Sequence, residues 1–285
     1  MSFRTVIINN RSKLDYELFY IVIKNETITK IPIQEVSFLI INNVQSSITT
    51  FLLAKLVEFK IKVLFCDEKR NPCSELTPFY SNYSNFSRIR QQINWDQSIK
   101  DDLWCRIIKR KLFNSNLLLN KVNKFSHEID GYLEHVELGD KTNREGHAAK
   151  VYFNSLFGNS FSRGKDCSIN KFLNYGYAII VSAINREIKM AGYLTEVGIH
   201  HIGETNPFNL SYDFIEPLRA LIDSFVVLNK VNEENYKKVF QNILSQKVIF
   251  NSNEMYLENA IHLYILSLFA YLNDGKQPVF IEYEF

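Results

Sequence analysis

The sequence has few cysteines, and their spacing excludes the common cysteine-based sites. Four occur in 285 residues, at Cys66, Cys73, Cys105 and Cys167, and no two of them form a CxxC pair. A zinc ribbon or a thioredoxin-like redox site is therefore poorly supported. We predict four reduced thiols, some of them buried as small apolar side chains.

Long apolar runs are missing as well, and so are the features of a signal peptide. No stretch of roughly eighteen or more apolar residues occurs, which is the length a transmembrane helix requires. The N-terminal residues lack the charged-then-apolar layout and the small-residue cleavage site of a secretory leader. We therefore expect a cytoplasmic protein, and its 46% hydrophobic content is enough for two modest cores.

The sequence also lacks a large excess of positive or negative charge. The net charge is only +2, so any nucleic-acid-binding surface must be local. One segment, Cys105–Lys124, has no acidic residue, and its basic residues are Arg106, Lys109, Arg110, Lys111, Lys121 and Lys124. Two interpretations stay open for it, namely a solvated helix face and a stripe that faces phosphates.

The apolar patterns divide the chain into a strand-rich and a helical part. Residues 1–75 contain short β-branched runs, which predict strands at Thr5–Ile8, Leu18–Ile23, Val36–Ile41 and Ile61–Cys66. Between the last two runs, the pattern predicts a helix over Ser46–Leu56 with Ser46 or Ser47 as its cap.

From residue 76 onward, the spacing of the apolar residues differs from that in the strand-rich part. Residues 76–95 alternate aromatic residues with Ser and Asn, which predicts a linker, with docking onto its own domain favoured over stacking on bases. Residues 96–285 show helical spacing until a strand-like run at Val279–Phe285. The sequence thus predicts an α+β fold, in which a β-rich N-terminal domain precedes a mostly α-helical domain.

Three segments carry residues capable of chemistry. Glu145 shares a helix face with Ala148 or Ala149 and with Tyr152, although a solvated helix glutamate is the favoured interpretation of Glu145 taken alone. The adjacent pair His200-His201 lies on a predicted loop, where functional residues concentrate.

The third segment is Ser211–Arg219, for which a purely structural explanation exists. Asp213 as a helix N-cap, with Glu216 three residues later, would form a capping box. Combined with the histidine, however, these carboxylates suit magnesium or, with an imidazole ligand, manganese. Such a site fits phosphodiester chemistry.

The order of these segments resembles that in the CRISPR-associated integrase family, and the resemblance covers essentially the whole chain. Arg144–Ala148 followed by Tyr152-Phe153 is similar to the family's Arg-Glu-x-x-Ala-x-x-x-Tyr-Phe/Trp helix. Gly198–His201 is similar to its Gly-x-x-His loop, and Glu216–Arg219 to its Glu-Pro-Phe/Leu-Arg motif. The stretch after His201 most resembles members from type II systems.

The resemblance implies a role for each matched residue. Glu145, His201 and Glu216 would be the catalytic metal ligands for Mn²⁺ or Mg²⁺, with Asp213 as an outer-shell group. The family places the segment Leu173–Tyr177 near the active site, which makes Asn174 and Tyr175 supporting candidates. Expected contacts to double-stranded DNA come from Arg106, Lys109, Arg110, Lys111, Arg163 and Lys165.

The resemblance also implies an architecture, a reaction and partners. The family has an N-terminal β-sandwich-like domain, which mediates homodimerisation, a linker and a helical catalytic domain. The 3′-hydroxyl of a captured DNA fragment attacks a phosphodiester of the CRISPR repeat. Two homodimers are bridged by a small adaptation subunit, and in type II systems the RNA-guided nuclease and an accessory protein take part.

Three other interpretations remain open on the residues alone. The protein could be a standalone branched-DNA nuclease on the same fold, or a DNA-binding scaffold without catalysis. In the third, the glutamates and the histidine are purely structural.

Overall fold

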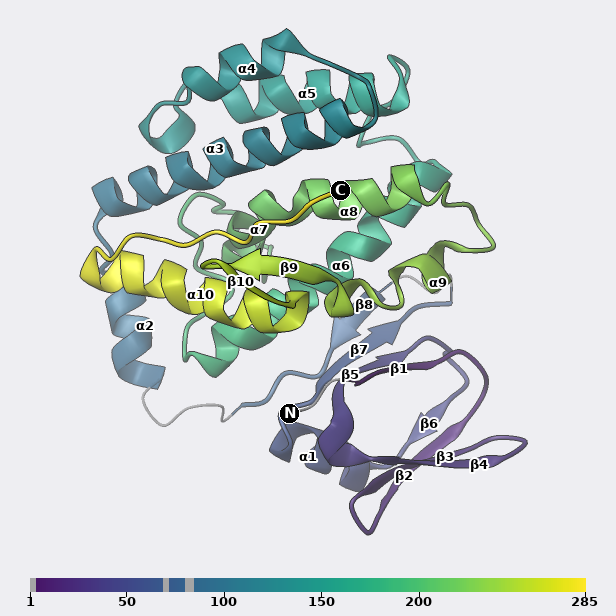
Figure 1. The fold of residues 1–285 in the computed structure, drawn as a ribbon. Helices are drawn as coiled ribbons and strands as arrows, with labels where there is room; N and C mark the ends of the chain where they lie inside the picture. The colour runs from purple at the N-terminus through teal and green to yellow at the C-terminus, as the bar shows by residue number, and fades with distance from the viewer. Residues whose placement is uncertain (1–3, 69–71, 80–84) are drawn as a thin grey trace. The chain divides into compact units, whose positions relative to one another are not determined.

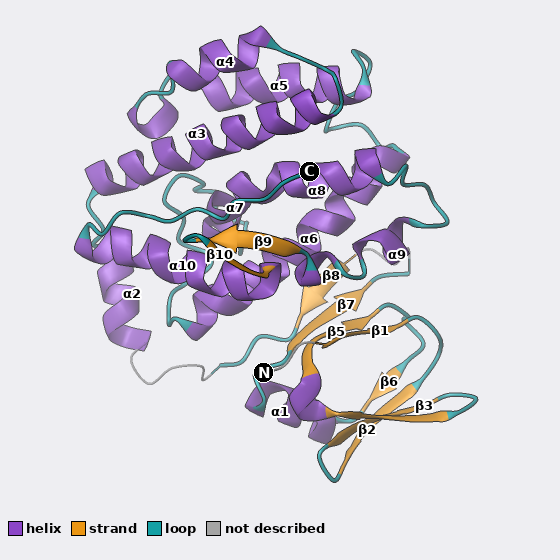
Figure 2. Ribbon diagram, in the orientation of Figure 1, coloured by secondary structure: helices purple, strands orange, loops and turns teal. Residues whose placement is uncertain are grey.

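The computed structural model describes residues 4–68, 72–79 and 85–285. The chain forms two compact units, residues 1–80 and 81–285, which are treated separately below. The first unit is rich in strands and the second is mostly helical (Figure 2). The predicted α+β fold, with its strand-rich part first, is therefore confirmed.

The first unit contains two four-stranded sheets. One sheet has the order β1 (Arg4–Ile8), β5 (Val36–Ile41), β7 (Lys62–Cys66) and β8 (Pro72–Glu75). The other has the order β4 (Ile28–Pro32), β3 (Tyr20–Lys24), β2 (Lys13–Glu17) and β6 (Ser47–Ile48). The 3-10 helix η1 (Ile33–Glu35) and helix α1 (Thr50–Glu58) complete it. Strand β5 pairs in parallel with β1 and β7 and is buried at every position, as its apolar run predicts.

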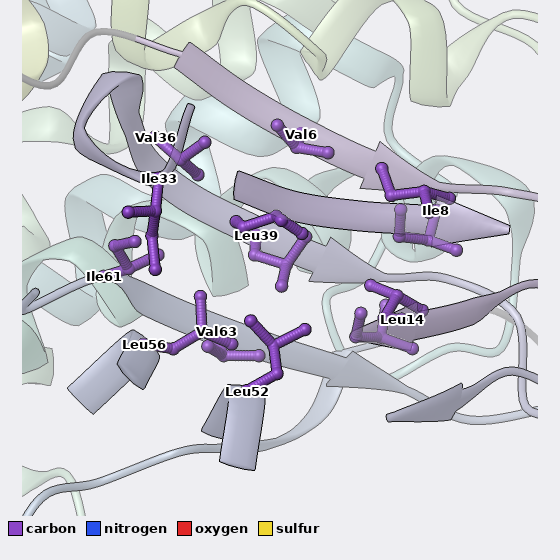
Figure 3. Packing of buried hydrophobic residues seen from close by; sticks show 13 residues of the cluster. Val6, Ile8, Leu14, Ile33, Val36, Leu39, Leu52, Leu56, Ile61 and Val63 are labelled. Atoms are coloured by element: carbon purple, nitrogen blue, oxygen red, sulfur yellow. The ribbon is translucent and has the colours of Figure 1, made fainter. Parts of the chain in front are cut away.

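The core of this unit lies where the sheets and α1 meet. Leu39 and Val63 come from the first sheet, Leu14 from the second, and Leu52 and Leu56 from α1 (Figure 3). All five side chains are fully buried. Each contributes about 1.5–3 kcal/mol through burial, so apolar packing holds the two sheets and the helix together.

Two local predictions for this unit are wrong. The expected strand Leu18–Ile23 begins two residues later, at Tyr20, because Leu18 and Phe19 form the turn between β2 and β3 with φ of 46° and 68°. Helix α1 begins later than predicted: its cap is Thr49, whose hydroxyl accepts a hydrogen bond from the backbone N–H of Leu52 (3.2 Å), and Ser47 belongs to β6.

The second unit is built from helices and one hairpin. The long helices are α3 (Gln97–Lys121), α5 (Arg144–Phe157), α6 (Ser168–Met190) and α10 (Leu257–Asp274). The shorter helices are α2 (Asn85–Ile93), α4 (His127–Glu134), α7 (Asn209–Ile215), α8 (Arg219–Leu228) and α9 (Tyr236–Phe240). The 3-10 helices are η2 (Leu138–Asp140), η3 (Glu216–Leu218) and η4 (Ile243–Ser245), and the hairpin is β9 (Lys247–Phe250) with β10 (Asn253–Tyr256).

Helix α3 runs through the middle of the helical unit and positions most of the site. Helices α4 and α5 lie along one side of it, and α7, η3 and α8 contact another side (Figure 1). Helix α6 is buried, and a Cβ at its Gly176 would stand 2.5 Å from the ring of Phe240 and 2.6 Å from Ile222. The glycine therefore permits close packing of α6 against α8 and α9.

The segment from residue 76 to 95 differs from a simple linker in its described part. Helix α2 occupies Asn85–Ile93, and Trp95 is buried between Tyr193 and Phe269. Its indole N–H donates to Asn273 (2.9 Å), so this stretch docks onto the helical unit. The aromatic run at 80–84 lies outside the described residues.

Two further sequence expectations concern the end of the chain and the membrane. The predicted strand Val279–Phe285 is reduced to one bridge, between Ile249 and Glu282. In the part of the chain that the structure describes, none of the helices combines the length and apolar character needed to span a bilayer.

Candidate metal centre

The two glutamates singled out in the sequence converge on one lysine. Glu145 lies in the first turn of α5, and Glu216 begins η3. The ammonium of Lys111, from the middle of α3, contacts Oε1 of Glu145 and lies 2.5 Å from Oε2 of Glu216. Three segments far apart in the sequence therefore bring two carboxylates and one cation together.

The start of α5 is fixed by two polar side chains, and this fixes Glu145. The carboxylate of Asp140 accepts hydrogen bonds from the backbone N–H groups of Arg144 (2.8 Å) and Glu145 (2.9 Å). The amide oxygen of Asn143 accepts from Gly146 (3.2 Å). These contacts satisfy donors that a helix start leaves free, and Asp140 adds a favourable negative charge there.

Glu216 is held at a break between two helices. Pro217 follows it, so α7 does not continue as a regular α-helix and the short η3 joins it to α8. Arg219 donates to Oε1 of Glu216 through Nε (2.8 Å). Burial by itself raises the pKa of Glu216, but Arg219 and Lys111 outweigh it and hold the pKa at about 2. Glu216 is therefore buried and stays ionised at neutral pH.

The carbonyl groups freed by this break are bonded by residues from elsewhere. The carbonyl of Pro217 accepts from the side-chain amide of Asn114 (2.8 Å) and from the hydroxyl of Tyr283 (2.7 Å). The carbonyl of Phe214 accepts from the hydroxyl of Tyr264 (3.0 Å). The Glu216 segment thus depends on α3, α10 and the C-terminal segment for its backbone bonding.

Asp213 holds the histidine loop, and the predicted capping box is wrong. Asp213 lies inside α7 and is fully buried. Its Oδ2 accepts from the backbone N–H groups of Ile199 (2.7 Å) and His200 (3.1 Å), and its Oδ1 from the backbone N–H of His201 (3.0 Å). Oδ1 also lies 2.6 Å from Nδ1 of the His201 ring.

This arrangement fixes the orientation of the His201 ring. With Nδ1 bonded to Asp213, Nε2 is the ring nitrogen left to bind a ligand. The hydrogen bond to Asp213 raises the pKa of His201 despite partial burial, and the charge of Glu216 adds to this. A Cβ at Gly198 would stand 2.3 Å from the carbonyl oxygen of His201, so the loop can close in this way only with glycine there.

His200 faces a different neighbour. Its ring stacks on Trp104 of α3, with centroids 4.0 Å apart and planes 6° apart, and partial burial lowers its pKa. Trp104 also meets the His201 ring edge-on at 5.7 Å. His200 therefore anchors the loop on α3, while His201 is the histidine that Asp213 orients.

A buried polar network lies behind Glu216. The Arg219 guanidinium lies 4.8 Å from the centre of the Tyr177 ring. Tyr177 and Tyr152 each donate a hydroxyl to Asp223, the latter at 2.7 Å. Burial raises the pKa of Asp223 to about 6, although both hydrogen bonds lower it. Through the Tyr177 ring, this network contacts Arg219, which in turn donates to Oε1 of Glu216. Lys111 contacts the other carboxylate oxygen, Oε2.

The donor set suits a divalent cation, although the ligands are not gathered around one point. Over residues 4–68, 72–79 and 85–285, no three His, Cys, Asp or Glu side chains are arranged to hold a metal ion. Glu216 Oε2 is nevertheless buried and accepts no well-aligned hydrogen bond, despite the nearby ammonium. Two carboxylates and an imidazole with a free Nε2 fit Mn²⁺ or Mg²⁺ chemically.

The two supporting candidates, Asn174 and Tyr175, contact other residues of the helical unit. Asn174 is exposed and accepts from Arg163 (2.7 Å), while Tyr175 is buried against Tyr236 and Phe240. From that segment it is Tyr177 that reaches the network behind Glu216.

The predicted DNA-binding residues have varied surroundings. Arg106 pairs with Asp102 (2.6 Å) and Arg110 with Glu282 (3.3 Å), whereas Lys111 belongs to the glutamate pair. Arg163 and Lys165 bond within their own loop and to α6, Lys165 through the carbonyl of Ser160 (2.8 Å). Lys109 is exposed and, with Lys141, lines an open recess of about 560 Å³.

Sequence reasoning missed four residues that shape the site. They are Trp104, Asp140, Tyr152 as a hydrogen-bond donor, and Lys111 as an ion-pair partner. Asp140, four positions before the first residue of α5, was the only one with a local signal, that of an acidic residue near a helix N-terminus.

Comparison with known proteins identifies the family of this chain. The profile of the family described as "CRISPR associated protein Cas1" matches residues 6–255. A protein of Neisseria meningitidis serogroup C, described as "CRISPR-associated endonuclease Cas1", is 33% identical over 80% of this chain and 76% of its own. A Francisella tularensis subsp. novicida protein, "CRISPR-associated endonuclease Cas1 1", is 27% identical over 87% of this chain and 89% of its own.

Solved structures share the fold at low sequence identity. A casposase bound to integration product has a TM-score of 0.80 at 18% identity, covering 96% of this chain and 92% of its own. A CAS1 protein from Thermotoga maritima has a TM-score of 0.78 at 16% identity, covering 98% of this chain and 100% of its own. With a family match over most of its length and a relative at 33% identity, this chain belongs to the Cas1 family of CRISPR-associated endonucleases.

Proposed function

We propose that this protein is a divalent-metal-dependent DNA integrase that inserts new spacers into a CRISPR array. In the forward reaction a DNA 3′-hydroxyl attacks a repeat phosphodiester, which forms a new phosphodiester and releases the 3′-hydroxyl of the cut repeat strand. The reverse reaction at the same site cuts branched DNA and rejoins the repeat strand. The observation that carries the proposal is the approach of Glu145 and Glu216 to one cation, beside a histidine oriented by Asp213. Membership of the Cas1 family supports it.

Glu145, His201 and Glu216 are the proposed ligands of Mn²⁺ or Mg²⁺. When bound, the ion neutralises charge that develops on the reacting phosphate and orients the attacking hydroxyl. Glu216 remains ionised because Arg219 stabilises it, so it needs no deprotonation before it binds an ion. Asp213 positions Nε2 of His201 through the Nδ1 contact and the loop backbone.

Double-stranded DNA is the proposed substrate, held by contacts that do not depend on sequence. The candidates are Arg106, Lys109, Arg110, Lys111, Arg163 and Lys165. Among them Lys109 is exposed and lines a recess with Lys141. The recess also contains Glu137 and Asp102, the latter paired with Arg106, so its two ammonium groups are the part that could contact a phosphate backbone. Charge reversal at Lys109 and Arg110 should lower the salt dependence of DNA binding, and an unchanged salt slope would remove this part of the proposal.

The proposed partners follow from the family. Solved relatives include a TtCas1–DNA complex and a Cas6-RT-Cas1–Cas2 complex, with TM-scores of 0.59 and 0.72. For this chain we propose a homodimer formed through the strand-rich unit, two of which are bridged by a small adaptation subunit. In a type II system the RNA-guided nuclease and an accessory protein would join them, in the cytoplasm where the array lies.

The test is a resealing assay on a branched DNA that mimics a half-integrated spacer. The purified protein is incubated with Mn²⁺, Mg²⁺ or chelator, beside His201→Ala and Glu216→Ala. His127→Ala, which alters an exposed histidine of α4, is the matched control. We expect metal-dependent resealing by the wild type and the control only. Resealing by folded His201→Ala at the wild-type rate would remove the proposed site.

The standalone-nuclease and scaffold interpretations are separated by the same assay. Resealing without any binding to a small adaptation subunit would favour the standalone nuclease. DNA binding without resealing, with every metal and with the subunit present, would favour the scaffold.

A further inference from the structure

Lys111 occupies an unusual place for a lysine. It lies on a long helix, its side chain is only 12% exposed, and its ammonium contacts both Glu145 and Glu216. Lysine is rarely buried unless it is paired, and here both partners are the proposed metal ligands. The ammonium of Lys111 therefore contacts both carboxylates, as a metal ion bound by the two glutamates would.

The charges in this cluster are balanced without a metal ion. Glu145 and Glu216 carry two negative charges, and Lys111 and Arg219 carry two positive charges. Glu216 is buried and Glu145 is partly exposed. Without these cations the buried charge of Glu216 would be left uncompensated, which destabilises a folded protein strongly, and the nearby charge of Glu145 would add repulsion. The ion pairs with Lys111 and Arg219 therefore compensate the charges of Glu145 and Glu216 by themselves.

We propose that Lys111 is a built-in substitute for the metal ion, which holds the two glutamates in the metal-free protein and must be displaced when a divalent ion binds. This inference rests on the proposed function, because it takes Glu145 and Glu216 as ligands. Lys111 then sets the metal affinity of the site without being a ligand itself.

Displacement follows from the charge balance and from the available space. A divalent ion added to a neutral cluster leaves two excess positive charges, and like charges a few ångströms apart repel strongly in a poorly solvated site. The cavity behind Lys111, lined also by Ser115, Ala148 and Asp223, has a volume of only about 20 Å³. That is room for about one water molecule, and Leu112, Ala148, Phe153 and the cationic Arg219 line it. An inward move would place the ammonium among apolar groups and beside a like charge, so the ammonium moves towards solvent.

The first test measures Mn²⁺ binding directly, by the electron paramagnetic resonance signal of free Mn²⁺ in titrations of the full-length protein. We expect Lys111→Met to bind Mn²⁺ more tightly than the wild type, by on the order of tenfold. Lys111→Arg keeps the charge and should bind as weakly as the wild type. Lys121→Met, which removes an exposed lysine from the same helix, is the control and should leave the affinity unchanged.

The outcomes separate this inference from the proposed function. Mn²⁺ binding that is equal in the wild type and in folded His201→Ala and Glu216→Ala would overturn the metal site itself. Binding that is lost in these variants but no tighter in Lys111→Met would leave the metal site standing and overturn the role of Lys111.

The second test uses the wild-type protein, so it does not depend on whether Lys111→Met folds. Lysines are labelled with an amine-reactive reagent, with chelator or with saturating Mn²⁺, and each site is quantified by mass spectrometry. We expect Lys111 to be labelled slowly with chelator and at least about fivefold faster with Mn²⁺, while Lys121 does not change. Equal labelling of Lys111 in both conditions, with Mn²⁺ bound, would overturn the proposed displacement.

Discussion

Asp213 offers a demanding test of the site, because one carboxylate holds the whole histidine loop. It is fully buried and accepts three backbone hydrogen bonds and the Nδ1 contact of His201. Replacement by asparagine keeps the shape of the side chain but turns one of its two oxygens into an NH₂ group. That NH₂ group would face two of the four donors.

The loss of unfolding free energy can be estimated for each of the two orientations of the asparagine amide. If the NH₂ group replaces Oδ2, the N–H groups of Ile199 and His200 both lose a charged acceptor. Hydrogen bonds to charged groups contribute about 1.5–3 kcal/mol each, so this placement costs about 3–6 kcal/mol. If it replaces Oδ1, a changed tautomer of His201 recovers the ring contact, and the cost falls to about 2–3 kcal/mol.

We therefore expect Asp213→Asn to lower the free energy of unfolding by about 2–3 kcal/mol or more. The measurement is urea unfolding in the presence of chelator, with Asp274→Asn, an exposed substitution at the end of α10, as the control. Mn²⁺ affinity is measured on the folded variant and should fall, since His201 is no longer held. A variant within 0.5 kcal/mol of the wild type, a difference usual for surface substitutions, would refute the four-contact arrangement.

Three other predictions follow from contacts around the site. Burial raises the pKa of Asp223 from 3.8 to about 6, so the folded protein binds this proton more tightly than the unfolded chain. Stability should then fall by about 3 kcal/mol as the pH rises from about 4 to 6, and Asp223→Asn should lose this part of the pH dependence in urea unfolding. Gly198→Ala should cost about 2–3 kcal/mol and abolish Mn²⁺ binding, whereas Gly131→Ala, with no atom within 4 Å of its Cβ, should not destabilise. Tyr283→Phe should cost about 1 kcal/mol in thermal unfolding, because it removes a buried hydrogen bond to the Pro217 carbonyl.

The sequence correctly predicted those features that depend on interactions between residues close together in the chain. The division into strands and helices, the helical face that contains Glu145 and the loop position of His201 all follow from apolar period and turn chemistry. The Leu18-Phe19 turn was missed because neither residue has the usual preference for positive φ. There the pairing of β2 with β3 overrides the local preference.

The parts of the site that were not predicted depend on contacts between distant segments. An aspartate three residues before a glutamate has the pattern of a capping box, and only the folded-back loop at 198–201 gives Asp213 another role. Lys111 was one of several basic residues in its segment. Nothing within α3 distinguishes it from Lys109, because its partners come from α5 and η3.

The contact of Tyr283 with the Glu216 turn ties the site to the order in which the protein is made. Glu145, His201 and Glu216 leave the ribosome before α10 and Tyr283 do. A nascent or prematurely terminated chain therefore carries every proposed ligand while the carbonyl of Pro217 still lacks one of its two donors. For an enzyme proposed to cut and join DNA, the backbone bonding of the Glu216 turn is therefore completed only when the last segment of the helical unit, which contains Tyr283, has been made.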